Sequence, residues 1–306
     1  DALVASKELE ITLTGKSCGL EERAPMCGIP YHAVEGYLSK LVSRGYKVAI
    51  CEQVEDPKLA KGLVKREVIR VVTPGTNLNV QSLEAGKNNY LLSIAYTPDG
   101  IGISAADVTT GDYYVTEVED LKELNDELMK YELSEIICNE AFLVSGFDVN
   151  DLKSRLHISV NALESHMFDD DGCRRILMKH FKVNTLIGLG VEEFPTGLLA
   201  AGALLQYLYD TQKTDLEHFT HIYPYLTSKY MLLDSSTRRN LELTETLREK
   251  QKRGSLLWVL DKTKTAMGAR LLRNYIEQPL IEKDEMEKRL DAIQELNQDS
   301  ISRDEI

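Results

Sequence analysis

Apolar positions in the first quarter of the chain change from helical spacing to strand-like runs within a few residues. Four apolar residues share one predicted helix face, and a glycine follows where a left-handed helix cap belongs: Val34, Leu38, Leu41, Val42 and Gly45. Strands are predicted at residues 11–14, 46–51 and 67–73, and a helix is predicted to end near residue 9. These elements indicate a small mixed α/β domain over residues 1–76 and a polar linker over residues 77–89.

The middle of the chain contains three apolar, β-branched runs separated by hairpin signals such as Pro98-Asp99-Gly100. The runs cover residues 90–96, 101–108 and 113–118. Helical and strand patterns then alternate: a helix at 120–131, strands at 135–138 and near 156–160, and a helix at 169–181. Three antiparallel strands followed by alternating α and β elements is the order of an RNase H-like layered sheet. We therefore expect this fold over residues 90–193.

From residue 194 onward the hydrophobic pattern is helical. The segment 195–213 has a broad apolar face and a run of small residues, which predicts a buried joining helix. Shorter helices are expected at residues 237–245, 255–260, 266–276 and 281–297. We assign residues 194–306 to an all-α segment and class the chain as a multidomain α/β protein. Within this segment, Arg238 is expected to pair with Glu242 or Glu245, and Trp258 to anchor the core.

Charge is distributed unevenly along the 306 residues, whose net charge is −13. Residues 1–76 hold 11 Lys and Arg against 10 Asp and Glu, whereas residues 77–306 hold 25 against 39. A strongly acidic protein does not coat nucleic acid by bulk electrostatics. Any nucleic-acid contact is therefore expected in the first quarter of the chain, with the acidic remainder serving as scaffold.

Several classes of site are not indicated by the sequence. The five cysteines form no CxxC pair, so reduced, mostly buried thiols are expected rather than a zinc site or a disulfide framework. There is no G-x-x-x-x-G-K-[ST] phosphate loop, so we expect neither a nucleotide cofactor nor ATP hydrolysis in this chain. No apolar run approaches the ~20 residues that span a bilayer, and the start has no signal-peptide pattern. The first residue is not Met and the chain opens mid-pattern, which predicts an excised piece.

Long motifs across the chain resemble the MutS family of DNA mismatch-repair proteins. They are GIPYHAVEGYLSKLV, VAICEQ, VIRVVTPGT, FPTGLLAAGALLQYLYDTQKT, MLLDSSTRRNLEL and SLLWVLDKTKTAMGARLLRNYIEQPL. The resemblance implies most of a mismatch-binding domain, then a connector, then the start of the helical core with its lever helices. It also implies that the whole protein is a cytoplasmic, nucleoid-associated homodimer that binds mismatched double-stranded DNA and signals to a MutL-type partner through the connector. ATP and magnesium would belong to an ATPase domain beyond residue 306.

In this family an aromatic residue of a Phe-x-Glu motif stacks on the mispaired base, and the duplex kinks there. That motif would lie upstream of Asp1, so the resemblance implies that this piece lacks the aromatic residue that stacks on the mispaired base. The supporting loop remains, and its apolar and cationic residues are the DNA-binding candidates. They are Arg23, Pro25, Met26, His32, Lys58, Lys61, Lys65 and Arg66. His32 could instead cap the following helix, the lysines could form a solvated face, and Tyr31 is expected in the core.

Two other classes of function compete with this interpretation. RNase H-like nucleases carry a metal-binding carboxylate on their first strands, and Asp107 ends such a strand here. Two-metal chemistry needs several converging carboxylates, and no second or third partner can be assigned, so a turn-capping role is expected for Asp107. The last alternative is a structural interaction module that does not contact DNA.

Overall fold

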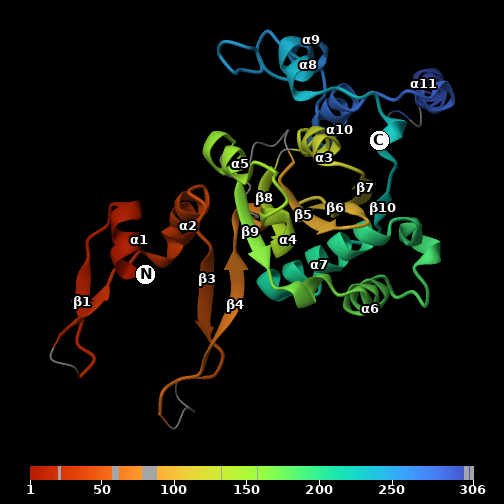
Figure 1. Ribbon diagram of the computed structural model, residues 1–306. Helices are drawn as coiled ribbons and strands as arrows, with labels where there is room; N and C mark the ends of the chain where they lie inside the picture. The colour runs from red at the N-terminus through yellow and green to blue at the C-terminus, as the bar shows by residue number, and fades with distance from the viewer. Residues whose placement is uncertain are drawn as a thin grey trace.

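The computed structural model describes residues 1–19, 22–56, 62–77, 88–131, 133–156, 158–299 and residue 303. It has three parts: an N-terminal unit (residues 1–76), a sheet unit (residues 88–224) and a helical segment (residues 227–299). In Figure 1 the N-terminal unit stands to one side of the sheet unit, and the helical segment lies across another side. The mixed α/β class predicted from the sequence is confirmed.

The N-terminal unit contains two separate two-stranded sheets and two helices. Its elements are α1 (Ala2–Leu9), β1 (Thr14–Lys16), β2 (Ala24–Met26), the 3-10 turn η1 (Tyr31–Ala33), α2 (Val34–Val42), β3 (Val48–Gln53), β4 (Arg66–Val72) and the 3-10 turn η2 (Pro74–Thr76). β1 pairs with β2 and β3 with β4, both antiparallel. Gly45 has φ 83°, as its predicted capping position requires. The first strand begins at Thr14, later than the pattern predicts, because Glu10 ends α1 in a left-handed conformation and residues 11–13 form the connection.

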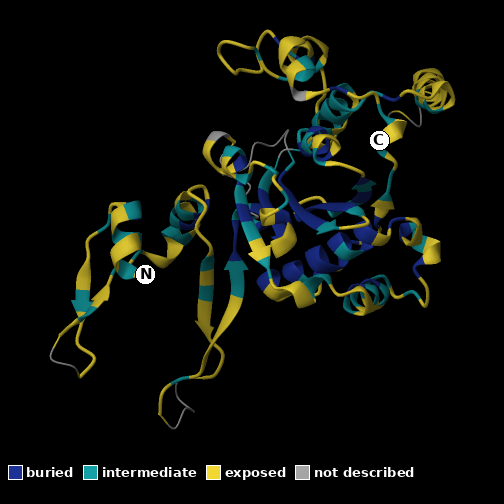
Figure 2. Ribbon diagram, in the orientation of Figure 1, coloured by how far each residue is buried: buried dark blue, intermediate teal, exposed yellow. Residues whose placement is uncertain are grey.

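Side chains of the N-terminal unit are mostly exposed (Figure 2). The buried apolar residues of its helices are few, namely Leu9, Leu38 and Val42. An ion pair of 2.5 Å between Arg44 and Glu8 joins α2 to α1. Cys18 and Cys51 are exposed, so the expectation of mostly buried thiols is wrong for this unit, because few of its residues are buried. Only Cys138 and Cys173, in the sheet unit, are buried.

The sheet unit is built on six strands in the order β10-β7-β6-β5-β8-β9. Their bounds are β5 (Tyr90–Thr97), β6 (Gly100–Asp107), β7 (Asp112–Val118), β8 (Leu133–Asn139), β9 (Ser159–Leu163) and β10 (Tyr223–Pro224). β5, β6 and β7 form the predicted antiparallel meander, whereas β8 runs parallel to β5 and β9 parallel to β8. The last strand, β10, is two residues long and pairs in parallel with β7.

Helices cover both faces of this sheet, which gives two hydrophobic cores. One core lies under α3 (Leu121–Leu128), α4 (Glu140–Leu143) and α5 (Val149–Arg155). The other lies under α6 (Asp170–Phe181) and α7 (Pro195–Gln212). Because both faces are covered, β5 and β6 are buried along nearly their whole length, as Figure 2 shows.

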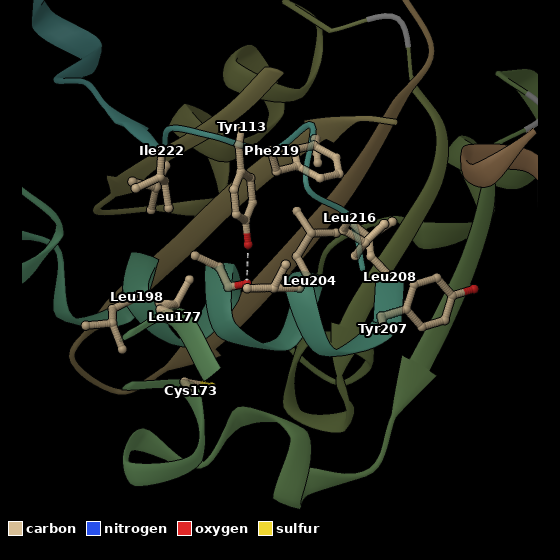
Figure 3. Packing of buried hydrophobic residues seen from close by; sticks show 14 of the residues in the cluster. Tyr113, Cys173, Leu177, Leu198, Leu204, Tyr207, Leu208, Leu216, Phe219 and Ile222 are labelled. Carbon is tan, nitrogen blue, oxygen red and sulfur yellow. Dashed lines mark hydrogen bonds between the residues drawn. The ribbon is translucent and has the colours of Figure 1, made fainter. Parts of the chain in front are cut away.

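Helix α7 packs on the sheet rather than on the later helices. Its hydrophobic pattern predicts burial, and its buried face packs on β5 and β6. The domain limit at residue 194 stays a prediction. Glycine permits the close approach, because a Cβ atom on Gly102 would lie 1.9 Å from the backbone oxygen of Thr196. Tyr113 reaches from β7 to α7 and donates a hydrogen bond of 2.5 Å to the carbonyl oxygen of Ala201 (Figure 3). The helix is therefore part of the sheet unit's core.

The helical segment carries α8 (Ser235–Asn240), α9 (Leu256–Leu260), α10 (Ala266–Glu277) and α11 (Lys283–Gln298). The expectation that residues 194–306 are all-α is wrong for β10 and for the β-bridge between Tyr230 and Leu280. The chain is extended there, and its backbone N–H and C=O groups form hydrogen bonds to neighbouring extended segments. Trp258 is 48% exposed, so the expected core anchor is wrong: α9 turns this side chain outward. No helix in the described ranges has both the length and the apolar character to span a bilayer.

A buried carboxylate joins the N-terminal unit to the sheet unit. Glu135 on β8 is fully buried, and one of its oxygens accepts a hydrogen bond of 2.7 Å from the hydroxyl of Tyr207 on α7. The Nζ atom of Lys47, which precedes β3, lies 3.5 Å from the same oxygen and 3.0 Å from the Tyr207 hydroxyl. The second carboxylate oxygen accepts a hydrogen bond from the backbone N–H of Gly75 in η2. This junction anchors β3 and η2 to the sheet.

Candidate nucleic-acid interface

The β1–β2 ribbon presents the predicted loop residues to solvent. Its register places Pro25 opposite Gly15 and Met26 opposite Thr14. The hydroxyl of Thr14 donates a hydrogen bond of 2.8 Å to the backbone oxygen of Met26, which fixes the end of the ribbon. Pro25 and Met26 are both exposed, with Met26 at 43%. The ribbon thus holds two apolar side chains in water on a fixed backbone.

Arg23 lies immediately before β2 and is exposed. A Cβ atom on Gly15 would lie 2.9 Å from the Cβ of Arg23, so glycine lets the arginine cross the ribbon closely. Within the described ranges, no carboxylate forms an ion pair with this guanidinium. Its charge therefore remains available beside Pro25 and Met26.

His32 lies in η1, on the connection from β2 to α2, and is exposed. The N-cap positions of η1 and α2 are Pro30 and Ala33, and within the described ranges the His32 side chain forms no hydrogen bond, so the capping alternative is not supported. The neighbouring Tyr31 is 84% exposed, and the expectation that it is a core residue is wrong, because η1 turns its ring away from the helix packing. Both rings thus add to the exposed surface that follows β2.

The remaining basic candidates belong to the β3–β4 ribbon. Arg66 begins β4 opposite Gln53, and Lys65 precedes it; both are exposed. Lys65 pairs with Glu67 at 2.5 Å, so part of its charge is compensated, whereas Arg66 has no ion-pair partner among the described residues. Lys58 and Lys61 lie outside the described residues. Figure 1 shows both ribbons extending toward the same end of the N-terminal unit.

Asp107, on which the nuclease alternative depends, is occupied by the turn after β6. One carboxylate oxygen accepts hydrogen bonds from the backbone N–H and the hydroxyl of Thr109, at 2.8 and 2.6 Å. The other accepts a bond of 2.9 Å from the N–H of Asn89. The predicted turn-capping role is confirmed. No group of three or more His, Cys, Asp or Glu side chains suited to a metal ion occurs in the part of the chain that the structure describes.

Arg238 has the structural role that the sequence predicts, but it bonds backbone carbonyl groups rather than the carboxylates of Glu242 or Glu245. Its guanidinium donates to the carbonyl oxygens of Leu233, Met129 and Glu277, at 2.9, 3.3 and 2.8 Å. These bonds join α3, the entry to α8 and the end of α10. Burial lowers the pKa of Arg238 from its usual value, while the nearby Glu277 raises it. The carboxylate of Glu242 instead accepts from the N–H of Leu247.

Lys47 is a residue whose position the sequence did not reveal. It belongs to the basic stretch of residues 40–70, yet its ammonium group faces Glu135 and Tyr207 in the junction described above. The signal for such a partner was Glu135 itself, an acid at the start of a predicted strand whose next residues, Ile136 and Ile137, are apolar. A buried carboxylate needs hydrogen-bond donors or a cation, so this acid predicted a partner without identifying it.

Comparison with known proteins decides the family. Sequence models of three MutS domains match successive parts of the chain: MutS domain I at residues 1–81, MutS domain II at residues 89–220 and MutS domain III at residues 236–306. The chain belongs to the MutS family. The domain II match extends through α7, in agreement with the packing of that helix on the sheet.

Three similar relatives each carry the name DNA mismatch repair protein MutS. The protein of Lachnoclostridium phytofermentans is 66% identical over 306 residues, which is 100% of this chain and 33% of that protein. The protein of Ruminiclostridium cellulolyticum is 52% identical over 299 residues, covering 97% and 34%. The protein of Acetivibrio thermocellus is 49% identical over 311 residues, covering 100% and 35%. The chain thus spans about a third of the length of these MutS relatives.

Proposed function

We propose that this chain supplies the DNA-facing support loop and the connecting scaffold of a MutS protein that binds mismatched or looped duplex DNA. The match to MutS domain I over residues 1–81 and the names of the relatives support this proposal. The observation that carries it is the exposed pair Pro25 and Met26 on the β1–β2 ribbon, beside Arg23, which forms no ion pair with any described residue.

These side chains suit an opened minor groove. Proteins that kink duplex DNA lay apolar side chains against sugars and base steps, while cations hold the phosphates. A mispair is weakly stacked, so bending the duplex costs less there than in matched DNA. The side chains of Pro25 and Met26 carry no group that donates a hydrogen bond to a base edge. Selection would therefore come from deformability, with the ribbon supporting a kink rather than reading bases.

The sheet unit would act as the connector, with an RNase H-like fold. The antiparallel meander β5–β7 flanked by the parallel strands β8 and β9, with helices on both faces, supports this fold. The helical segment would begin the all-α core that leads into the lever helices, in the region matched by MutS domain III. For domain limits we propose residues 1–76 for mismatch binding, 77–89 for the linker and 90–193, extended through α7, for the connector.

The other activities belong to the whole protein, of which this chain covers about a third in its relatives. There, an ATPase domain would use ATP and magnesium, and a homodimer would clamp duplex DNA in the bacterial cytoplasm, at the nucleoid. A MutL-type partner would be contacted through the connector. This chain would perform none of the ATP chemistry itself. The names of the relatives support the repair role, and the rest follows from the family.

Fluorescence anisotropy with labelled duplexes tests the proposal. The chain is titrated onto a duplex with one G·T mispair and onto its matched counterpart, at about 50 and 200 mM salt. We expect measurable binding at the lower salt, a steep loss at the higher salt and little preference between the duplexes. The full-length relative from Lachnoclostridium phytofermentans, titrated in parallel, should in contrast prefer the mispair. If neither chain binds DNA at low salt, the DNA-binding proposal is wrong and the structural interaction module remains as the alternative.

Two variants locate the contact. Arg23→Gln should lower the slope of log affinity against log salt by about one, the value for one phosphate contact. Lys288→Gln removes one positive charge from α11, far along the chain from the ribbon, and serves as the matched control. Equal slopes for both variants would place the DNA elsewhere.

A further inference from the structure

A pocket of about 430 Å³ lies where the edge of the sheet unit meets the helical segment. Its walls come from β7, from β10 and the residues that follow it, and from α10 and α11. Its lining residues include four tyrosines and two cations, namely Tyr114, Tyr223, Tyr230, Tyr275, Lys229 and Arg289. The volume falls in the range of small-molecule sites. The pocket belongs neither to the candidate DNA interface nor to the junction at Glu135.

Aromatic rings form most of the pocket's apolar surface. The rings of Tyr114 and Tyr223 lie 5.9 Å apart between centroids at an interplanar angle of 39°. Tyr223 is 49% exposed, so part of its ring remains open to a ligand, whereas one face of the Tyr275 ring is covered by Arg289. Stacking a planar ligand on such faces is favourable and tolerates many ring systems.

The floor of the pocket is held rigidly by hydrogen bonds. The hydroxyl of Tyr225 donates to one oxygen of Glu127 at 2.5 Å, and Lys130 donates to the other oxygen at 2.5 Å. The hydroxyl of Tyr131 lies 2.6 Å from that of Tyr225. Because the Tyr225 proton is directed to Glu127, Tyr131 is the donor of this last bond. The floor groups are thus satisfied by one another, and the pocket needs no ligand to keep its shape.

The groups nearer the mouth, in contrast, have unused hydrogen-bonding capacity. The guanidinium of Arg289 stacks on the ring of Tyr275, with its central carbon 3.7 Å from the ring centroid. Among the described residues, the side-chain nitrogens of Arg289 and Lys229 have no hydrogen-bond or ion-pair partner, and the amides of Asn274 and Gln278 have none either. Two cations and two amides thus face one aromatic pocket.

The nearby acids do not cancel these charges directly. Asp112 accepts a hydrogen bond of 2.7 Å from the hydroxyl of Thr110. Glu285 pairs with Lys288 at 2.7 Å. Burial raises the pKa of Tyr114 and of Tyr230, so these hydroxyls stay protonated and can donate hydrogen bonds at neutral pH. Among the described lining residues, the pocket therefore presents the cations Arg289 and Lys229 and protonated tyrosine hydroxyls, beside one carboxylate, that of Asp112.

We propose that this pocket binds a nucleotide unit, with the base stacked on the exposed ring of Tyr223 and the phosphate held by Arg289 and Lys229. Aromatic faces suit the base, the amides of Asn274 and Gln278 suit its polar edge, and a guanidinium suits the phosphate. Two cations match one phosphate group rather than a triphosphate. The unit comes either from a free nucleoside monophosphate or from single-stranded DNA.

Isothermal titration calorimetry of the 306-residue chain with adenosine 5′-monophosphate tests this inference. We expect one saturable site per chain, with adenosine and inorganic phosphate each bound at least about ten-fold more weakly, because each lacks one half of the contact. Arg289→Gln should weaken the monophosphate about ten-fold and leave adenosine nearly unchanged. Tyr223→Ala should weaken both ligands by about five-fold or more.

A matched control lies on the same helix. Lys283→Gln removes the same charge, but Lys283 pairs with Glu287 at 3.0 Å and does not line the pocket. Its affinity for the monophosphate should equal that of the unchanged chain. Circular dichroism spectra that coincide for all four proteins show that the variants fold.

A final set of titrations separates the two sources of the nucleotide. A single-stranded oligodeoxyadenylate of five residues that binds more tightly than the monophosphate, and loses affinity with Arg289→Gln, indicates a strand as the ligand. Tighter binding of the free monophosphate indicates the free nucleotide. The proposal is overturned if no saturable monophosphate binding occurs up to 10 mM. It is equally overturned if Arg289→Gln and Lys283→Gln bind the monophosphate alike.

Discussion

The N-terminal unit and the sheet unit use the same kinds of element with different degrees of burial. In the sheet unit, helices cover both faces of a six-stranded sheet, and β5 and β6 contain few exposed residues. In the N-terminal unit, two isolated ribbons have mostly exposed strands. Stability therefore resides in the sheet unit, and the exposed unit is positioned by a few contacts at the junction. The difference shows how a surface suited to DNA can be presented without a large core of its own.

The largest expected difference between the two units is in thiol reactivity. Burial raises the pKa of Cys138 to about 11 and that of Cys173 to about 12, whereas Cys18 and Cys51 are exposed. At pH 8 the buried thiols should react with Ellman's reagent at least about 100-fold more slowly, because so little thiolate forms. Peptide mass spectrometry after timed quenching measures this. In urea all the rates should converge, and equal rates in the native chain would contradict the comparison.

A glycine-to-alanine change should have opposite effects in the two units. Gly102→Ala places a Cβ against the backbone of Thr196, so α7 must move, at a cost of about 3 kcal/mol in unfolding free energy. Gly36, on the open side of α2, has no atom within 4 Å of such a Cβ. Gly36→Ala should therefore stabilise α2 by about 0.5–1 kcal/mol. Urea unfolding followed by circular dichroism measures both; a loss for Gly36→Ala would show hidden packing on that side.

Changes at the junction should destabilise the chain less than Gly102→Ala does. Glu135→Gln keeps the side-chain size but removes the negative charge that faces Lys47. The new amide NH2 group would also face a hydrogen-bond donor such as the N–H of Gly75, so the free energy of unfolding should fall by about 2 kcal/mol. Lys47→Met removes only the partly exposed partner and should cost about 1 kcal/mol or less. Limited proteolysis should release residues 1–76 faster in both variants. Unchanged cleavage would mean that the two units are held by other contacts.

Much of the sheet could be predicted because its signals are local. The meander β5–β7 follows from three apolar runs and two turns, each readable within about ten residues. The partner of α7 could not be predicted in this way. A helix that is apolar nearly all round predicts burial, but not which surface covers it. The approach of Gly102 to Thr196 depends on residues far apart in sequence.

At the candidate site, the exposure of the turn could be predicted from the sequence, but the ion-pair partners of the basic residues could not. Pro25 and Met26 follow from a polar loop that precedes a helix, and the structure leaves both exposed. The direction of Lys47 could not be inferred, because a lysine in a basic stretch gives no sign of a buried acid on another element. The tyrosine pocket was missed for the same reason, since its walls come from four separate elements.

One consequence follows from the shortness of β10. Its two residues shield the outer border of β7, and the segment that continues from them is tied to α10 through the bridge between Tyr230 and Leu280. Moving the helical segment away would separate β10 from β7 and expose the backbone N–H and C=O groups of β7 that now pair with β10. A sheet border in that state recruits strands from other molecules. The helices after β10 therefore also act as a guard against self-association.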